Sequence, residues 1–125
     1  MDRTQQFWNE QAEWSKATFG KTSERGPLGA LKHLEKEAKE AQVEASLLIE
    51  SKKEDSILTR DDVKDITSNL KVELADCLFL TLDSARRAGM TLDELLDTAF
   101  IKLEINKNRK WQRPTSDGPV EHVRE

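Results

Sequence analysis

The 125-residue sequence contains one cysteine, three prolines and no tyrosine, and aromatic residues make up only 6% of it. A single cysteine excludes an internal disulfide framework and a cysteine-based zinc site, and it fits a reducing cytosol. The first residues lack the apolar core of a secretory signal, and the longest mostly apolar stretch, residues 74–82, is too short to span a bilayer. We therefore expect a single cytoplasmic domain that covers residues 1–125 and does not enter a membrane.

An excess of positive charge is also missing. Twenty basic residues against 24 acidic residues give a net charge of −4. Binding to a nucleic-acid backbone needs a positive field, so we expect no nucleic-acid partner. The cations on either side of Trp111 make a local nucleic-acid patch the least favoured alternative.

No glycine or proline occurs between Gly29 and Gly89, and few segments are rich in β-branched residues. These two absences predict an all-α fold. We expect helices over residues 4–18, 27–49, 60–88 and 91–111, or five helices if the third breaks near Ser68. Helix-capping signals at Thr59 and Thr91 and the positions of Gly20 and Gly89 set these limits. Residues 112–125 are predicted to form an extended polar tail.

The first helix is expected to bury a face formed by Phe7, Gln11, Trp14 and Thr18. The run of residues 74–82 is apolar nearly all round, which predicts a buried helix that contains Asp76. A buried ionised carboxylate is costly unless a cation or a metal ion compensates it. An ion pair with Lys102 or Arg109 would satisfy Asp76 without any functional role.

Acidic residues occur at matching spacings on two of the expected helices, as Glu37 and Glu40 and as Glu73 and Asp76. A solvated acidic face is the simplest explanation of the first pair. If the two helices pack face to face, however, the four carboxylates converge and need a counter-charge. Oxygen ligands suit Mg²⁺ or Mn²⁺, whereas the sequence lacks the Glu-x-x-His pair of di-iron bundles and the ligands that zinc prefers.

Cations gather at the end of the last expected helix. Lys102, Asn106 and Arg109 share a face, where they could hold phosphate oxygens. Their alternative role is to complement the negative end of the helix dipole.

Several segments together resemble a known family. The two acidic pairs, the second within VELADCLFL, and the later KLEINKNRKW resemble the MazG-like nucleoside triphosphate pyrophosphatases. The segments TFGKTSERGPLGALKHLEKEAKEA, LDSARRAGMTLDELL and DGPVEHVRE resemble the branch of dATP/dGTP diphosphohydrolases that includes the MazZ-type phage enzymes. Many members of the wider family carry a further Glu where this chain has Lys36, for which Glu35 or Glu44 could substitute.

The resemblance implies an all-α bundle that assembles as a homodimer or homotetramer, in the host cytoplasm if the protein is of phage origin. It implies hydrolysis of dGTP or dATP to the monophosphate and pyrophosphate. Glu37, Glu40, Glu73 and Asp76 would be the catalytic residues and would bind two or three Mg²⁺ ions, for which Mn²⁺ could substitute. Lys102, Asn106 and Arg109 would bind the polyphosphate.

Base recognition is assigned to the first two helices, where Trp14 or Phe19 would stack on a purine and His33 would contact base or sugar. Packing in the core or at a subunit interface is the alternative for Trp14, and a surface position is the alternative for His33. Asp83 and Arg86 are expected to form a structural pair on the surface, with support of the metal ligands as the alternative role. Cys77 is expected to be a small core residue. The competing function class is a non-enzymatic helical adaptor whose acidic faces are solvated.

Overall fold

Four helices make up the regular structure of the chain. The computed structural model describes residues 2–114 and 117–123, and within them lie α1 (Arg3–Phe19), α2 (Leu28–Ser51), α3 (Arg60–Arg87) and α4 (Leu92–Lys107). These residues contain no strand beyond one isolated bridge, so the all-α prediction is confirmed. Helix α3 runs unbroken past Ser68, which excludes the five-helix alternative. None of the described helices is both long and apolar enough to cross a membrane.

Local sequence signals set the helix ends. The side chain of Thr59 accepts a hydrogen bond from the Asp62 backbone N–H, and the Asp62 carboxylate accepts one from the Thr59 N–H, which is the predicted capping box. Gly20 follows α1 with a φ of 93°, and Gly89 follows α3 with a φ of 89°. Both values lie in the region that favours glycine, which explains why α1 and α3 end where they do.

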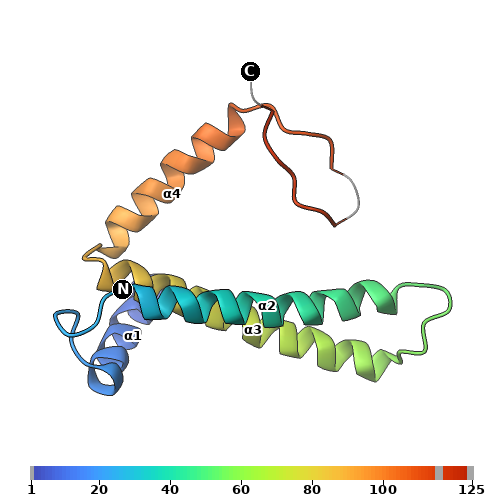
Figure 1. Ribbon diagram of the computed structural model, residues 1–125, viewed down its shortest axis with the longest axis horizontal. Coiled ribbons are helices and arrows are strands. Elements are labelled where there is room, and N and C mark those ends of the chain that lie inside the picture. The colour runs from blue at the N-terminus through green and yellow to red at the C-terminus, as the bar shows by residue number, and fades with distance from the viewer. Residues whose placement is uncertain (1, 115–116, 124–125) are drawn as a thin grey trace. The chain divides into compact units, whose positions relative to one another are not determined.

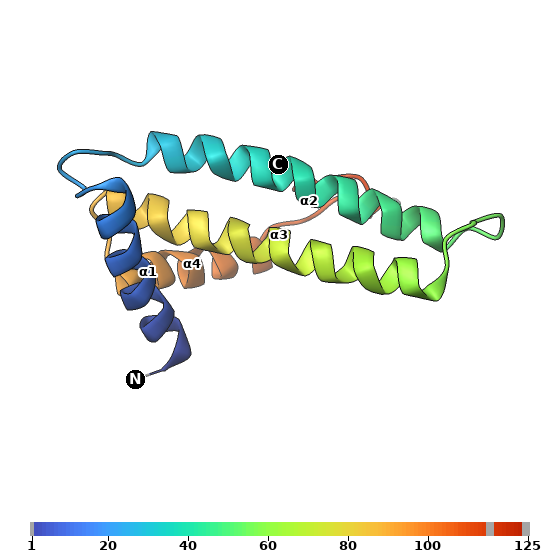
Figure 2. The same ribbon diagram turned by 90° about the horizontal axis from the view of Figure 1, so that it is seen from below.

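The first compact unit of the chain comprises residues 1–92. Its helices α2 and α3 form a long antiparallel pair (Figure 1). Helix α1 crosses one end of this pair (Figure 2). The buried apolar side chains of the unit are Trp8, Ala30, Ala41, Ile66, Leu80, Leu82, Ala85 and Leu92.

The buried face of α1 differs from the predicted one. Trp8, Gln11 and Ser15 are buried, whereas Phe7 and Trp14 remain 39% and 49% exposed. The reason is that Gln11 and Ser15 donate hydrogen bonds to a buried carboxylate of α3, so a partly polar face turns inward. Periodicity of apolar residues could not reveal that preference.

The prediction that residues 74–82 are buried all round is wrong for this chain. Leu74 and Leu78 are each 56% exposed, and Asp76 is exposed as well. Helices α1 and α2 cover only part of the circumference of α3, which leaves the opposite stripe open. Asp76 is therefore not a carboxylate trapped in an apolar core.

The second compact unit, residues 93–125, holds most of α4 and the tail. Helix α4 ends at Lys107 rather than near Trp111, whose indole N–H instead donates a hydrogen bond of 2.8 Å to the Asn106 carbonyl. Gln112 donates its backbone N–H to the Glu121 carbonyl at 3.0 Å. The described part of the tail thus folds back on itself instead of extending; residues 115–116 and 124–125 lie outside the described residues.

Candidate active site

Three of the four predicted metal ligands converge between α2 and α3. Glu37 on α2 and Glu73 and Asp76 on α3 each offer one carboxylate oxygen, and these oxygens all lie within 4.8 Å of one another. The antiparallel packing of the two helices brings Glu37 opposite the α3 pair. The i, i+3 spacing places Glu73 and Asp76 on the same face. We call these three residues the acidic cluster.

Glu40 lies at the border of the acidic cluster. Its carboxylate is outside the group of converging oxygens, but its negative charge contributes to raising the pKa of Glu73. One turn of α2 separates Glu40 from Glu37.

The described residues give the acidic cluster no counter-charge sufficient for three ionised acids. The hydrogen bond with Glu37, burial and the negative charges of Glu37, Glu40 and Asp76 raise the pKa of Glu73 to about 7. The same hydrogen bond lowers the pKa of Glu37, which carries the negative charge of the pair. The Glu73 Oε2 atom is buried and has no hydrogen-bond partner among the described residues. An oxygen-only donor set of this kind fits a hard divalent cation such as Mg²⁺ or Mn²⁺.

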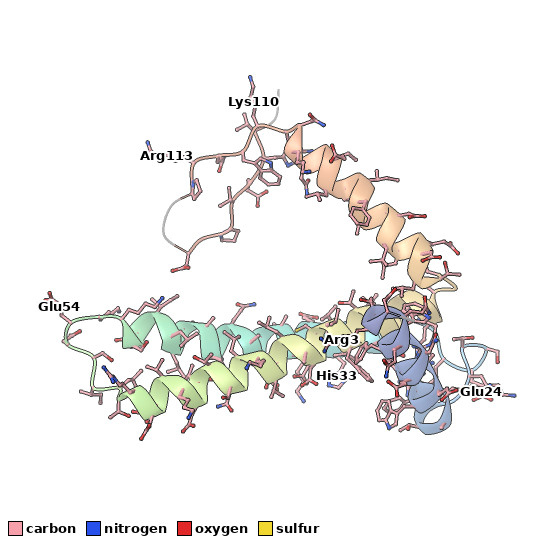
Figure 3. All side chains as sticks on the ribbon, turned by 180° about the vertical axis from the view of Figure 1, so that it is seen from behind. Arg3, Glu24, His33, Glu54, Lys110 and Arg113 are labelled. Atoms are coloured by element: carbon pink, nitrogen blue, oxygen red, sulfur yellow. The ribbon has the colours of Figure 1, made fainter. Side chains whose placement is uncertain are left out.

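His33 contacts the acidic cluster directly. Its Nε2 lies 3.0 Å from the Glu37 Oε1, one turn along α2. Figure 3 shows His33 on the part of α2 near α1, at the other end of the helix pair from Glu54. The Glu37 side chain is only 12% exposed, whereas that of His33 is 56% exposed. His33 therefore helps to orient a predicted metal ligand; the predicted contact with base or sugar stays a prediction.

A cavity of about 370 Å³ adjoins the acidic cluster. Trp14, Phe19 and His33, the three predicted base-binding residues, line it together with Glu37 and Asp76. The other residues that line it are Arg25, Gly26, Gly29, Ala30, Phe79, Leu80, Asp83 and Arg87. A cavity lined by aromatic and aliphatic side chains together with several polar groups is typical of a site for a small molecule.

Aromatic side chains shape the apolar part of this cavity. The ring of Trp14 lies edge-on to Phe19 at a centroid distance of 5.3 Å and to Phe79 at 5.4 Å. Sequence reasoning missed Phe79 and Arg25. Phe79 could have been found from its spacing, because it follows Asp76 by three residues and so shares its face of α3.

Another carboxylate on α3, that of Asp83, has several hydrogen-bond donors and two arginines as partners. It is 5% exposed and accepts hydrogen bonds from Gln11 at 3.1 Å, from Ser15 at 2.8 Å and from the Arg87 Nε at 3.2 Å, as well as one from Arg86. Burial pushes the pKa of Asp83 upward, but the hydrogen bonds and the two arginine charges outweigh burial and lower it. The Asp83–Arg86 pair is thus a buried structural pair.

The predicted phosphate-binding residues Lys102, Asn106 and Arg109 belong to the unit of residues 93–125. Lys102 and Asn106 lie on α4, and Arg109 follows its last turn. Their role at the polyphosphate stays a prediction. Cys77 is half-buried, and burial followed by the charges of the acidic cluster raises the pKa of its thiol, which disfavours the thiolate that a nucleophile needs.

Comparison with known proteins gives one family and one relative. The sequence profile of the dATP/dGTP pyrophosphohydrolase family matches residues 7–125. A 55-residue segment is 46% identical to the Eaa protein of Salmonella phage P22, and the match covers 43% of this chain and 17% of the phage protein. No solved structure is significantly similar to the chain.

Proposed function

Because this chain belongs to the dATP/dGTP pyrophosphohydrolase family, we propose that it is a hydrolase acting on nucleoside triphosphates and that it converts dGTP or dATP, in a Mg²⁺-dependent reaction, to the monophosphate and pyrophosphate. The observation that carries the proposal is the convergence of Glu37, Glu73 and Asp76 beside an aromatic-lined cavity, of which Glu37 and Asp76 form part of the wall. The function of a non-enzymatic adaptor, the alternative class, does not require converging carboxylates beside a cavity.

The proposed metal ligands are Glu37, Glu73 and Asp76, with Glu40 as a fourth carboxylate at the border. The unpartnered Glu73 Oε2 and the raised pKa of Glu73 support this assignment. A bound cation would coordinate this oxygen, and its positive charge would lower the pKa. Two or three Mg²⁺ ions, or Mn²⁺ in their place, would neutralise phosphate charge and lower the pKa of a water molecule.

In the proposed reaction a water oxygen adds to the α-phosphorus and the bond between the α-phosphate and the bridging oxygen breaks, so that pyrophosphate leaves. A carboxylate of the acidic cluster accepts the proton of this water. His33 helps to hold Glu37 in place through the 3.0 Å contact. Phosphoryl transfer needs mainly positioning and charge stabilisation, so acids, cations and a metal suffice.

The nucleotide base is proposed to occupy the aromatic end of the cavity, in contact with Trp14, Phe19 and Phe79. Because Glu37 and Asp76 line the same cavity, a nucleotide bound in this way could present its phosphates to the proposed metal ligands. Lys102, Asn106 and Arg109 are proposed to bind the polyphosphate, as the family resemblance implies.

The proposal includes a homodimer or homotetramer in the cytoplasm of a phage-infected host. It is supported by large apolar side chains that remain exposed on α2 and α3, namely Val43, Leu47, Leu74 and Leu78. Light scattering coupled to gel filtration measures the assembly directly, and a monomer at micromolar concentration would contradict this part of the proposal.

The decisive experiment measures pyrophosphate release from a panel of deoxy- and ribonucleoside triphosphates, with Mg²⁺, with Mn²⁺ and with a chelator. We expect dGTP or dATP to give the highest kcat/KM, and we expect the chelator to abolish release. Identification of the monophosphate by chromatography distinguishes cleavage of the α–β bond from cleavage of the β–γ bond. Absence of pyrophosphate release from every triphosphate would overturn the proposed function.

A further inference from the structure

The loop between α1 and α2, residues 20–27, contributes one wall of the cavity. Arg25 and Gly26 of this loop line the cavity, and Phe19, the last residue of α1, lies next to them. The Arg25 guanidinium lies over the Phe19 ring, 5.5 Å from its centroid. The position of this loop therefore decides the shape of the end of the cavity to which we assign the base.

One buried side chain of α3 ties the loop to the helices. The Arg87 Nη1 donates to the Arg25 carbonyl at 3.1 Å, and its Nη2 donates to the Gly20 carbonyl at 3.5 Å. The same Nη2 donates to the Ser15 hydroxyl at 2.8 Å. The Arg87 side chain is 4% exposed, and Asp83 balances its charge through a contact of 3.2 Å with the Nε.

We propose that Arg87 is a positioning residue for nucleotide binding: it holds the loop of residues 20–27 in place so that Arg25 and Phe19 form one wall of the base site. The inference rests on the proposed function. Arg87 itself lines the cavity, but all three nitrogens of its guanidinium are already engaged by protein atoms, which favours action through the loop. A lysine could not reach the same set of acceptors, because an ammonium lacks the planar fork of donors.

The neighbouring arginine offers a matched control. Arg86 pairs with the same carboxylate, Asp83, and it donates to the Gln11 side chain of α1. No hydrogen bond links Arg86 to residues 20–27 among the described contacts. Loss of either arginine weakens the Asp83 cluster, but only loss of Arg87 also releases the loop.

The experiment compares Arg87→Gln with Arg86→Gln by two readouts. Titration calorimetry with dGMP and with dAMP measures binding of the base-containing product, and mass spectrometry after limited trypsin treatment measures cleavage of the Arg25–Gly26 bond. For Arg87→Gln we expect binding at least about tenfold weaker, the loss typical of hydrogen bonds to a charged group, and faster cleavage after Arg25. In turnover, KM should rise by a similar factor while kcat is retained. For Arg86→Gln we expect nucleotide affinity and cleavage like those of the wild-type protein.

Arg87→Lys is the control for a folding defect in Arg87→Gln, because it keeps a positive charge beside Asp83. We expect it to show the same loss of affinity and the same exposure of the Arg25–Gly26 bond, with wild-type helix content by circular dichroism. Equal loss of affinity in the Arg86 and Arg87 variants would overturn the inference, as would wild-type affinity in Arg87→Lys. Both readouts are independent of turnover, so a wild-type protein that binds dGMP but releases no pyrophosphate would overturn the proposed function alone.

Discussion

Helix α3 carries two acidic sites seven residues apart, around Asp76 and around Asp83, and the two are balanced in opposite ways. Asp83 is buried among Gln11, Ser15, Arg86 and Arg87, which supply hydrogen bonds and positive charge. Asp76 lies with two glutamates, and His33 is the one potentially cationic partner that the described contacts give this cluster. The chain supplies the counter-charge at Asp83, and we propose that a bound cation supplies it at Asp76.

The pKa values record this difference. Donors and arginines lower the pKa of Asp83 in spite of its burial, whereas neighbouring carboxylates and burial raise the pKa of Glu73 to about 7. A site whose electrostatics are satisfied within the chain is a structural element. A site whose negative charges have no counter-charge at neutral pH is where binding of a cation lowers the free energy most.

The largest effect is expected at the balanced site. Asp83→Ala leaves the buried Arg87 and the partly buried Arg86 without their carboxylate, so we expect the free energy of unfolding to fall by about 3–5 kcal/mol, as when one partner of a buried ion pair is removed. Urea denaturation followed by circular dichroism measures this loss. Asp65→Ala, an exposed acid on the same helix, is the control and should change stability little. A loss below about 1 kcal/mol, the range of surface pairs, would contradict the structural role of Asp83.

Removal of an acid from the unbalanced site should affect turnover instead. Asp76→Asn is expected to lower kcat by about 100-fold or more through loss of a proposed metal ligand, a change equivalent to about 2.7 kcal/mol. Stability should stay near that of the wild-type protein, because Asp76 is exposed. Pyrophosphate release together with urea denaturation checks both halves of the prediction. Wild-type turnover in Asp76→Asn would remove this residue from the catalytic set.

A smaller effect is expected at the aromatic wall of the cavity. Phe19→Leu keeps an apolar side chain but removes the ring that contacts Trp14 and Arg25. We expect KM for purine triphosphates to rise by about threefold to tenfold, in line with about 0.5–1.5 kcal/mol for an aromatic contact, with kcat unchanged. Phe100→Leu on α4, outside the cavity, is the matched control. Equal KM values in the two variants would place Phe19 outside the base site.

The smallest effects are slopes of stability against pH in metal-free protein, and the two sites give opposite signs. The folded-state pKa of Glu73 is raised to about 7. Its contribution to the free energy of unfolding is therefore present below its ordinary pKa of 4.5 and is lost as pH rises toward 7. The folded-state pKa of Asp83 is lowered, so its contribution is present above its ordinary pKa of 3.8 and is lost as pH falls further.

Thermal unfolding between pH 3 and pH 8 tests both slopes. Glu73→Gln should flatten the slope between pH 4.5 and 7, and addition of Mg²⁺ to the wild-type protein should flatten it as well. A slope that Glu73→Gln leaves unchanged would contradict the crowding of carboxylates inferred at the acidic cluster.

Much of the fold could be predicted because it depends on local chemistry. The capping box of Thr59 and Asp62 and the positive φ angles of Gly20 and Gly89 are short-range effects, and they place the helix ends close to the predicted limits. Helix α4, in contrast, ends at Lys107, before the predicted end near Trp111. After this end, the Trp111 indole donates a hydrogen bond to the Asn106 carbonyl in the last turn of the helix.

The sequence by itself determined the all-α class and, within a few residues, the limits of α1, α2 and α3. It also determined the spacing that puts Glu73 beside Asp76, because a helix of 3.6 residues per turn brings residues i and i+3 together wherever it forms. Only the tertiary structure decided that Glu37 meets this pair while Glu40 stays at the border, and that Asp83 rather than Asp76 is buried. Helical periodicity defines faces, but the register of α2 against α3 and the part of α3 that α1 covers arise from packing between residues distant in the chain.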